Sequence, residues 1–500
     1  MGWKSKLIYP FAKKIASDVR YWSANAVKTQ EAIFHNLIDK AKETVFGKDH
    51  DFSKIKDYNS FKELIPIRDY EGLKDYIEII KNGGQSILWP GVPMYFAKTS
   101  GTTSGVKYIP LTKDSLPNHF GTARNALFNY YGTTGKGQFF DGKLIFLSGS
   151  PALEKTGNIL TGRLSGIVNH QVPSWLRTNQ LPGYKTNCIE DWEEKVDAIV
   201  QETMRADMRL ISGIPPWVQM YYERILDRAG KKYIKDVFPN YSMFVYGGVN
   251  FEPYRSTLEE LTGKRLDSVE TYPASEGFIA FQDSQTENGL LLNTNSGIFF
   301  EFIPANEISN PDPTRLSLKQ VEMGVNYVLI INNNAGLWGY NIGDTVEFVS
   351  LNPFRIKVTG RVKHYISAFG EHVIGKEVEE AMLRTCDQIS AKVTEFTVAP
   401  QINPKDGSKP FHEWYIEFDR APDDMIKFSA CLNQEMVRQN IYYEDLIKGA
   451  ILQPLRIKVL AKDSFRSYMR SQGKLGGQNK VPRLSNDRKL ANELIQYVEK

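Results

Sequence analysis

Five short apolar runs, each bounded by turn residues, constrain the fold of this chain more than any other feature. They occupy residues 144–147, 210–211, 243–246, 298–303 and 327–331. Runs of this length are typical of buried strands, and helical patterns lie between several of them. This alternation predicts an α/β core.

The remaining patterns divide the chain into two parts. Residues 26–46 predict an amphipathic helix, and Gly47 offers a C-terminal cap. The texture of the sequence changes around 351–365, so we predict a large N-terminal domain over 1–360 and a small α+β domain over 361–500. In the small domain we expect helices near 376–386 and 423–439, strands near 393–399, 413–419 and 455–461, and a last helix from Ser485, which suits an N-cap.

Composition argues against several classes of protein. The 62 Lys and Arg residues and 58 Asp and Glu residues give a net charge of +4, too slight for a nucleic-acid footprint. No apolar stretch reaches 18 residues, so we expect no membrane span. Pro10, Lys13 and Lys14 interrupt the first apolar run, which argues against a signal peptide. Three widely separated cysteines fit a reducing cytoplasm, and no HxH or HExxH spacing favours zinc.

Residues 99–107, which read Thr-Ser-Gly-Thr-Thr-Ser-Gly-Val-Lys, form the strongest local signal. Glycines let backbone N–H groups approach an anion, and hydroxyl groups add donors, so the segment suits a polyphosphate. It is not a Walker loop, because Gly101 and Gly105 are four apart and Tyr108 follows Lys107. A Ser/Thr-rich surface turn is the alternative.

Two further segments join an acid to a turn. In residues 269–277, Tyr272 could stack on a purine and Glu276 could hold magnesium through oxygen; alternatively, Tyr272-Pro273 is a common turn and Glu276 an exposed acid. In residues 339–344, Asp344 follows a glycine turn and could accept two ribose hydroxyls, although Gly-Asp is also frequent in hairpins.

Two basic segments follow. Arg361, within 359–371, could reach a phosphate or ribose, or it could be one more surface cation. The glycine-rich loop 473–483 offers Lys474 and Lys480, and such a loop is usually only solvated.

The order of these five segments resembles the core motifs of adenylate-forming enzymes, such as luciferases and acyl-CoA synthetases. More narrowly, the chain resembles the Gretchen Hagen family of acyl acid–amido synthetases, and the resemblance runs nearly end to end. The motifs that carry it are Phe61-x3-Ile65-Pro-Ile-x2-Tyr70, Thr99-Ser-Gly-Thr-Thr103, Tyr272-x2-Ser-Glu-Gly277, Gly336-Leu-x2-Tyr-x2-Gly-Asp344, Glu413-Trp414 and Leu432-Asn…Asn440-x2-Tyr443.

The resemblance implies a role for each candidate residue. It assigns ATP binding to Ser100, Gly101, Thr102, Thr103, Tyr272, Ser275, Asp344 and Arg361. The hydroxyl residues would bind the phosphates, Tyr272 would stack on adenine, and Asp344 would hold the ribose with Arg361 close by. Glu276 would lie near Mg²⁺ and the α-phosphate, Lys363 would occupy the hinge, and Lys480 would approach the forming acyl-adenylate.

The implied reaction activates a carboxylic acid with ATP, releases pyrophosphate and transfers the acyl group to an amino acid. Its fold would comprise a large adenylate-forming domain and a smaller mobile one that rotates about residues 360–365. Gly339 and Asn341 replace arginines common in the plant family, and Gly370-Glu371 resembles the wider superfamily, so an acyl-CoA ligase stays open. A silent nucleotide-binding protein is a further alternative. We expect small-molecule partners only, and a monomer or weak homodimer.

Overall fold

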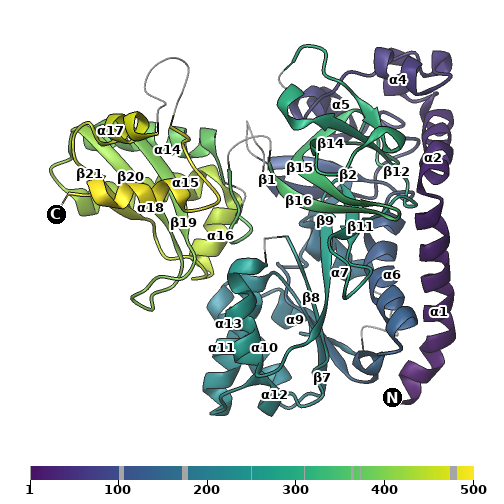
Figure 1. The fold of residues 1–500 in the computed structure, drawn as a ribbon, viewed down its shortest axis with the longest axis horizontal. Coiled ribbons are helices and arrows are strands. Elements are labelled where there is room, and N and C mark those ends of the chain that lie inside the picture. The colour runs from purple at the N-terminus through teal and green to yellow at the C-terminus, as the bar shows by residue number, and fades with distance from the viewer. Residues whose placement is uncertain are drawn as a thin grey trace.

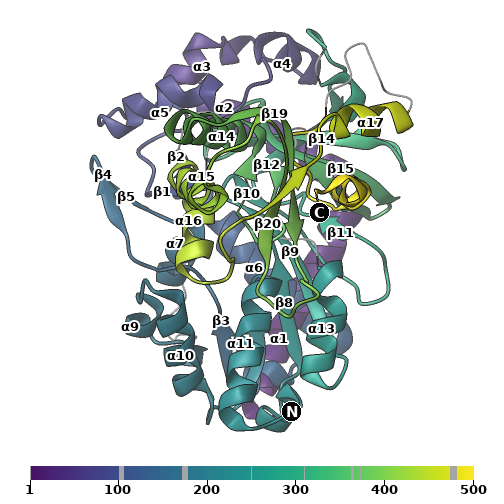
Figure 2. The ribbon, with the colours of Figure 1, turned by 90° about the vertical axis from the view of Figure 1, so that its left-hand side faces the viewer.

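The computed structural model describes residues 2–100, 106–171, 178–248, 251–308, 310–361, 365–371, 373–472 and 481–499. Within these ranges the chain forms a larger part built on a long sheet and a smaller part made of the C-terminal elements (Figure 1). Figure 2 views the molecule from the side of the smaller part, which lies in front of the long sheet.

The long sheet has twelve strands and two halves. The strands run in the order β13 (Leu316–Ser317), β12 (Ile298–Pro304), β14 (Asn326–Asn333), β15 (Tyr340–Leu351), β16 (Phe354–Arg361), β11 (Leu290–Leu292), β10 (Gly277–Phe281), β9 (Asp267–Ala274), β8 (Met243–Gly247), β7 (Met208–Ser212), β3 (Lys143–Phe146) and β6 (Gln180–Leu181). Pairs from β13 to β9 are antiparallel, and pairs from β9 to β6 are parallel. All five predicted apolar runs lie in this sheet as β3, β7, β8, β12 and β14, which confirms the α/β core.

The parallel half is buried on both faces, because successive side chains of a strand point to opposite sides. Leu210 and Met243 pack in a cluster with α1 (Trp3–Ala24) and α6 (Leu116–Thr134). Their neighbours Ile211 and Phe244 pack in a second cluster with α10 (Trp192–Thr203), α11 (Pro215–Ala229) and α13 (Glu252–Thr262). This double burial explains why these strands read as unbroken apolar runs (Figure 1).

Shorter elements complete the larger part. A four-stranded sheet has the order β2 (Val106–Leu111), β1 (Tyr95–Ser100), β5 (Ile159–Gly162) and β4 (Glu154–Thr156). The remaining helices are α2 (Ala26–Ala41), α3 (Val45–Asp49), α4 (Tyr58–Leu64), α5 (Lys74–Lys81), α7 (Leu164–Gln171), α9 (Tyr184–Asn187) and α12 (Ile234–Val237). None of the helices within the described ranges is both long enough and apolar enough to traverse a membrane.

The predicted helix over 26–46 is wrong at its C-terminal end. Helix α2 ends at Ala41, and Thr44 caps a separate helix, α3, by accepting the N–H of Gly47 at 3.0 Å. Gly47 therefore lies inside α3 and does not cap α2. A Cβ atom at Gly47 would come within 2.2 Å of the Ala41 carbonyl oxygen, so glycine here permits close packing of the two helices.

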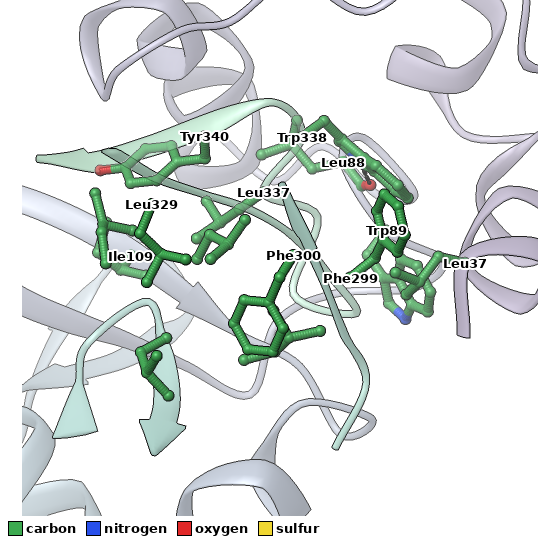
Figure 3. Packing of buried hydrophobic residues seen from close by; sticks show 14 of the residues in the cluster. Leu37, Leu88, Trp89, Ile109, Phe299, Phe300, Leu329, Leu337, Trp338 and Tyr340 are labelled. Atoms are coloured by element: carbon green, nitrogen blue, oxygen red, sulfur yellow. Dashed lines mark hydrogen bonds between the residues drawn. The ribbon is translucent and has the colours of Figure 1, made fainter. Parts of the chain in front are cut away.

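The largest core anchors the turn between β14 and β15. Trp338 is fully buried in this turn and donates its Nε1–H to the Leu88 carbonyl at 3.1 Å. Around it pack Trp89 and the side chains of β12, including Phe299, as Figure 3 shows. Aromatic packing around Trp338 therefore fixes the turn that leads to Asp344.

The smaller part contains the elements expected in its sequence. Its sheet has the order β19 (Lys392–Gln401), β20 (Phe411–Arg420) and β21 (Arg456–Leu460), and a short pair joins β17 (Tyr365–Ile366) to β18 (Val373–Ile374). Its helices are α14 (Gly375–Ile389), α15 (Met425–Gln439), α16 (Ile441–Lys448), α17 (Ser464–Ser471) and α18 (Lys489–Leu494).

The predicted start of the last helix at Ser485 is wrong. Ser485 instead donates its backbone N–H to the Val398 carbonyl at 2.9 Å, which holds it beside β19. The helix begins four residues later, at Lys489. A bond to the sheet has thus taken the place of the predicted helix cap.

Direct contacts join the two parts. The Tyr254 hydroxyl of α13 donates to the Ala368 carbonyl at 2.7 Å. The Tyr442 hydroxyl of α16 donates to the Lys98 carbonyl of β1 at 3.3 Å. Helix α16 therefore touches the strand that leads into the hydroxyl-rich segment.

Candidate active site

The described ends of the hydroxyl-rich segment belong to two paired strands. Strands β1 and β2 pair antiparallel, and the last register pair is Ser100 with Val106. The predicted phosphate-binding residues Gly101, Thr102 and Thr103 lie between these strands and outside the described residues, as does the side chain of Ser100.

The motif from Phe61 to Tyr70 links this hairpin to β15. The Tyr70 hydroxyl accepts the N–H of Tyr108 in β2 at 3.0 Å. Two residues earlier, Arg68 donates its N–H to the Gly339 carbonyl at 2.9 Å and accepts the N–H of Asn341 at 2.8 Å. One short segment thus fixes the β1–β2 hairpin relative to the Gly-Asp turn.

Glu276 lies at the tip of a second hairpin. Ala274 ends β9 and pairs with Gly277 of β10, so Ser275 and Glu276 form a two-residue turn. Helix α6 holds this hairpin, because the Asn118 side chain accepts the N–H of Phe278 at 2.7 Å.

Asp344 lies in a bulge of β15, where the register with β14 shifts. Gly343 has a φ of +87°, and a Cβ atom there would meet nothing within 4 Å. The carboxylate of Asp344 is only 8% exposed. A bare backbone beside a largely buried acceptor suits close approach of a polar ligand such as a ribose.

Tyr272 and Asp344 meet across the sheet although 72 residues separate them. Strand β11 spans only three residues between β10 and β16. The Tyr272 hydroxyl donates to Asp344 Oδ2 at 2.5 Å. Two of the predicted nucleotide-binding residues are therefore neighbours.

The Glu276 carboxylate contacts the same strand, β15. The Tyr340 hydroxyl lies 3.4 Å from Glu276 Oε1, and burial together with the nearby negative charge raises the pKa of Tyr340 well above its usual value. The hydroxyl therefore stays protonated and can donate to the acid.

The donor set fits magnesium. Glu276 is half-buried and offers carboxylate oxygen, the ligand type that Mg²⁺ prefers. Across the ranges that the structure covers, no group of three or more His, Cys, Asp or Glu side chains could hold a metal ion. Glu276 would thus be the protein ligand, and substrate phosphates would complete the shell.

The basic candidates are placed only in part. Arg361 ends β16, and its backbone pairs with that of Asp344, but its side chain lies outside the described residues. Lys363, at the predicted hinge, and Lys474 also lie outside them.

Lys480 lies outside the described residues, and the chain resumes beside it at Val481. Val481 is 8% exposed, and the carbonyl of the next residue, Pro482, accepts the Thr397 hydroxyl of β19 at 2.7 Å. The C-terminal end of the lysine loop is therefore fixed to the small sheet.

The departures from the plant arginine pattern have a structural cause. Gly339 has a φ of +56°, and a Cβ atom there would come within 2.4 Å of the Pro66 carbonyl oxygen. This backbone excludes an arginine at that position. Asn341 accepts the N–H of Gly343 at 2.8 Å through its side chain and thereby shapes the bulge.

A cavity of about 310 Å³ lies elsewhere, between α13 and strands β8 and β9, and none of the candidate residues lines it. Its walls include Tyr246, Phe251 and Arg255. The candidate site is therefore identified by convergence of side chains at strand ends and not by this cavity.

Sequence reasoning missed several supporting residues. Asn118 and Asn333 hold the Glu276 hairpin, and the Asn333 amide donates to the Glu276 carbonyl at 2.7 Å. A run of three asparagines, 332–334, immediately before the Gly-Asp motif was the available signal. Glu301 and Arg315 form a buried ion pair at 2.7 Å that no local pattern indicates.

Comparison with known proteins gives concordant results. Three successive domains of one family match this chain: the GH3 family N-terminal domain over residues 16–169, the central domain over 291–361 and the C-terminal domain over 376–489. Together these matches cover more than half of the chain.

Named relatives and solved structures agree. A jasmonoyl–L-amino acid synthetase of Nicotiana attenuata is 22% identical over 67% of this chain and 69% of its own. The indole-3-acetic acid-amido synthetase GH3.4 of Arabidopsis thaliana is 21% identical over 92% of this chain and 89% of its own.

Among solved structures, the GH3.15 acyl acid amido synthetase in complex with 2,4-DB superposes with a TM-score of 0.62 at 16% identity, over 98% of this chain and 96% of that one. A 2-hydroxyisobutyryl-CoA ligase superposes with a TM-score of 0.56 at 11% identity, over 97% of this chain and 92% of that one. Both neighbours share the fold. On the three domain matches and these relatives, the chain belongs to the GH3 family of acyl acid–amido synthetases.

Proposed function

We propose that this chain is an ATP-dependent ligase that activates a carboxylic acid as acyl-AMP and transfers the acyl group to the amine of an amino acid. Family membership supports this proposal. The observation that carries it is the double contact between two separate motifs: Tyr272 bonds Asp344, and Tyr340 of the same strand, β15, contacts Glu276. The division into units 1–360 and 361–500 is part of the proposal.

In the first step a carboxylate oxygen of the acid attacks the α-phosphorus of ATP, and the bond to pyrophosphate breaks. Asp344 would accept the ribose hydroxyls, and Tyr272, already bonded to Asp344, would pack against adenine. Ser100, Gly101, Thr102 and Thr103 would bind the phosphates. Such a reaction depends on positioning and charge neutralisation and needs no covalent residue.

Two anions meet in this step, so positive charge must be supplied. Lys480 would supply it from the small domain, and Arg361 would lie near the ribose and phosphate. Mg²⁺ bound at Glu276 would polarise the phosphate oxygens. Glu276 itself would orient the metal-bound phosphate through its fixed hairpin.

In the second step the amine nitrogen attacks the acyl carbon, a C–N bond forms and AMP leaves. A rotation of the small domain about residues 360–365 would exchange the groups around the acyl-adenylate. Helix α16 touches β1 through Tyr442 and Lys98, and Arg163 pairs with Asp445. These contacts join the domains in the arrangement seen here.

The molecule that accepts the acyl group, an amine or the thiol of coenzyme A, is the substrate that the fold constrains least, because the structural neighbours include a CoA ligase. Glu371, the residue that resembles the wider superfamily, is fully buried and bonds to His412 at 2.8 Å. Its side chain therefore serves packing in the small domain, and an amine acceptor is favoured by family membership.

The test measures pyrophosphate released from Mg-ATP against aromatic, aliphatic and hydroxylated carboxylic acids. Each reaction contains either mixed amino acids or coenzyme A, and mass spectrometry identifies the product. We expect acid-dependent release and an amide. A thioester would move the chain to acyl-CoA ligases, and ATP binding without release would favour the silent nucleotide-binding protein.

We also propose a cytoplasmic location and a monomeric or weakly dimeric state. Cys188, Cys386 and Cys431 are all free thiols, which fits a reducing compartment. Light scattering across a concentration series would test the oligomeric state, and a stable tetramer would contradict it.

A further inference from the structure

Three consecutive asparagines occupy the junction between the two halves of the candidate site. Asn333 ends β14, and the turn that follows leads to Asp344. Each asparagine bonds a different element. Asn332 accepts the N–H of Gly339 at 2.6 Å, whereas Asn334 donates to the Asp114 carbonyl at 2.8 Å, near the end of β2.

Asn333 bonds both the glycine turn and the glutamate hairpin. Its side-chain oxygen accepts the N–H of Ala335 at 3.0 Å and the N–H of Leu337 at 3.1 Å. Its amide Nδ2 donates to the Glu276 carbonyl at 2.7 Å. One side chain, 2% exposed, therefore ties Glu276 to the turn that precedes Asp344.

The chemistry of asparagine suits this bridge. Its amide offers an acceptor and a donor at once, whereas aspartate of the same shape lacks the donor. Serine and threonine offer a single hydroxyl that cannot accept two N–H groups and donate in a third direction at the same reach. A buried carbonyl that loses its donor costs about 1–3 kcal/mol, so the hairpin tip would shift to find another partner.

The hairpin is held from its other side by α6. Asn118 accepts the N–H of Phe278 at 2.7 Å and donates to the Phe278 carbonyl at 3.3 Å. These bonds fix β10, whereas Asn333 bonds Glu276 itself. At the tip itself, the Tyr340 hydroxyl contacts the Glu276 carboxylate and Asn333 holds the Glu276 backbone.

We infer that Asn333 is a positioning residue for the adenylation step: it holds Glu276 at a fixed place relative to the Gly339–Asp344 turn. This inference rests on the proposed function. Asn333 acts through Glu276 and touches no substrate itself. Its loss would alter how Glu276 meets Mg-ATP while leaving the other substrate contacts in place.

The experiment compares Asn333→Ala and Asn333→Asp with Asn334→Ala in the full chain. Asn333→Asp keeps both acceptor bonds to the turn, replaces the donor to Glu276 with an acceptor oxygen and adds a buried negative charge, so Asn333→Ala is read beside it. Asn334→Ala is the control, because it removes a neighbouring amide bond that is exposed and does not reach Glu276. For each protein we measure pyrophosphate release at varied Mg²⁺, ATP binding by calorimetry with and without Mg²⁺, and the melting temperature.

We expect both Asn333 variants to need several-fold more Mg²⁺ for half-maximal rate, and kcat to fall about tenfold or more, as a displacement near 1 Å at a reacting group can cause. Asn334→Ala should lower the melting temperature less, because its bond is exposed, and keep the Mg²⁺ dependence within about twofold of wild type. Equal behaviour of the Asn333 and Asn334 variants would overturn the inference and leave the proposed function standing.

Wild-type behaviour separates the two claims. A wild-type chain that binds Mg-ATP without releasing pyrophosphate would overturn the proposed function, and the Mg²⁺ dependence of ATP binding would then decide the role of Asn333. A wild-type chain that binds no ATP would overturn both.

Discussion

Arg315→Met tests whether the buried ion pair beneath the site is needed for the fold. Glu301 is fully buried in β12, and the Arg315 guanidinium donates two hydrogen bonds of 2.9 Å to its carboxylate. Tyr58 and Asn332 also donate to this carboxylate, at 2.9 and 2.8 Å. Without the guanidinium, a buried negative charge would keep only two neutral donors.

The structure sets the expected magnitude. Removing one partner of a buried pair typically costs about 3–5 kcal/mol, because the remaining charge stays desolvated. The exposed pair of Lys42 and Asp39, at 2.7 Å, is the matched control. Lys42→Met should change the free energy of unfolding by no more than about 1 kcal/mol.

Urea denaturation followed by tryptophan fluorescence is the appropriate assay, because Trp338 and Trp89 lie in the adjoining core. Circular dichroism of the same samples would show whether a single transition describes the unfolding. A loss below about 1 kcal/mol for Arg315→Met would refute the reasoning, since it would mean that Glu301 is solvated or neutral in the native state.

Three further predictions follow from the structure. Asp344→Asn should raise the KM for ATP by about tenfold or more, because hydrogen bonds to a charged acceptor contribute about 1.5–3 kcal/mol; an unchanged KM in steady-state assays would remove Asp344 from the ribose site. Burial lowers the pKa of His119 to about 4 from 6.5, so between these values only the unfolded chain takes up the proton and stability falls as pH decreases, by at most about 1.4 kcal/mol per pH unit. His119→Gln should flatten that slope in urea titrations from pH 4 to 6.5, and an identical slope would count against it. Asp445→Asn removes the ion pair with Arg163 and should shift the domain arrangement about fivefold toward the undocked form, as loss of about 1 kcal/mol implies; small-angle scattering identical to wild type would contradict this.

The sequence predicted the parts of the fold whose signal is local. The runs 210–211 and 243–246 read as strands because helices bury them on both faces, and the pattern survives without knowledge of topology. The helix predicted over 26–46 is too long at its C-terminal end, because a glycine after an apolar run indicates a cap. Gly47 instead allows α3 to pack closely against the Ala41 carbonyl. The distance between two helices cannot be inferred from the sequence pattern of either one.

The site was partly predictable for the same reason. Tyr272, Glu276 and Asp344 lie in motifs with recognisable spacing, but the bond between Tyr272 and Asp344 joins residues 72 apart in the sequence, and no local pattern predicts it. The supporting residues Asn118 and Asn333 could not be predicted, because their side chains bond backbone groups that are far away in the sequence. Asparagine carries no periodic signal of its own, so only the structure reveals what each amide bonds.

The measurement that tests the central claim most directly is pyrophosphate release from Mg-ATP with a carboxylic acid panel, run on wild type and Lys480→Ala. The account predicts release that requires both the acid and Mg²⁺, an amide product when an amino acid is present, and loss of release in the variant with ATP binding retained. A wild-type chain that binds ATP yet releases no pyrophosphate with any acid would contradict it.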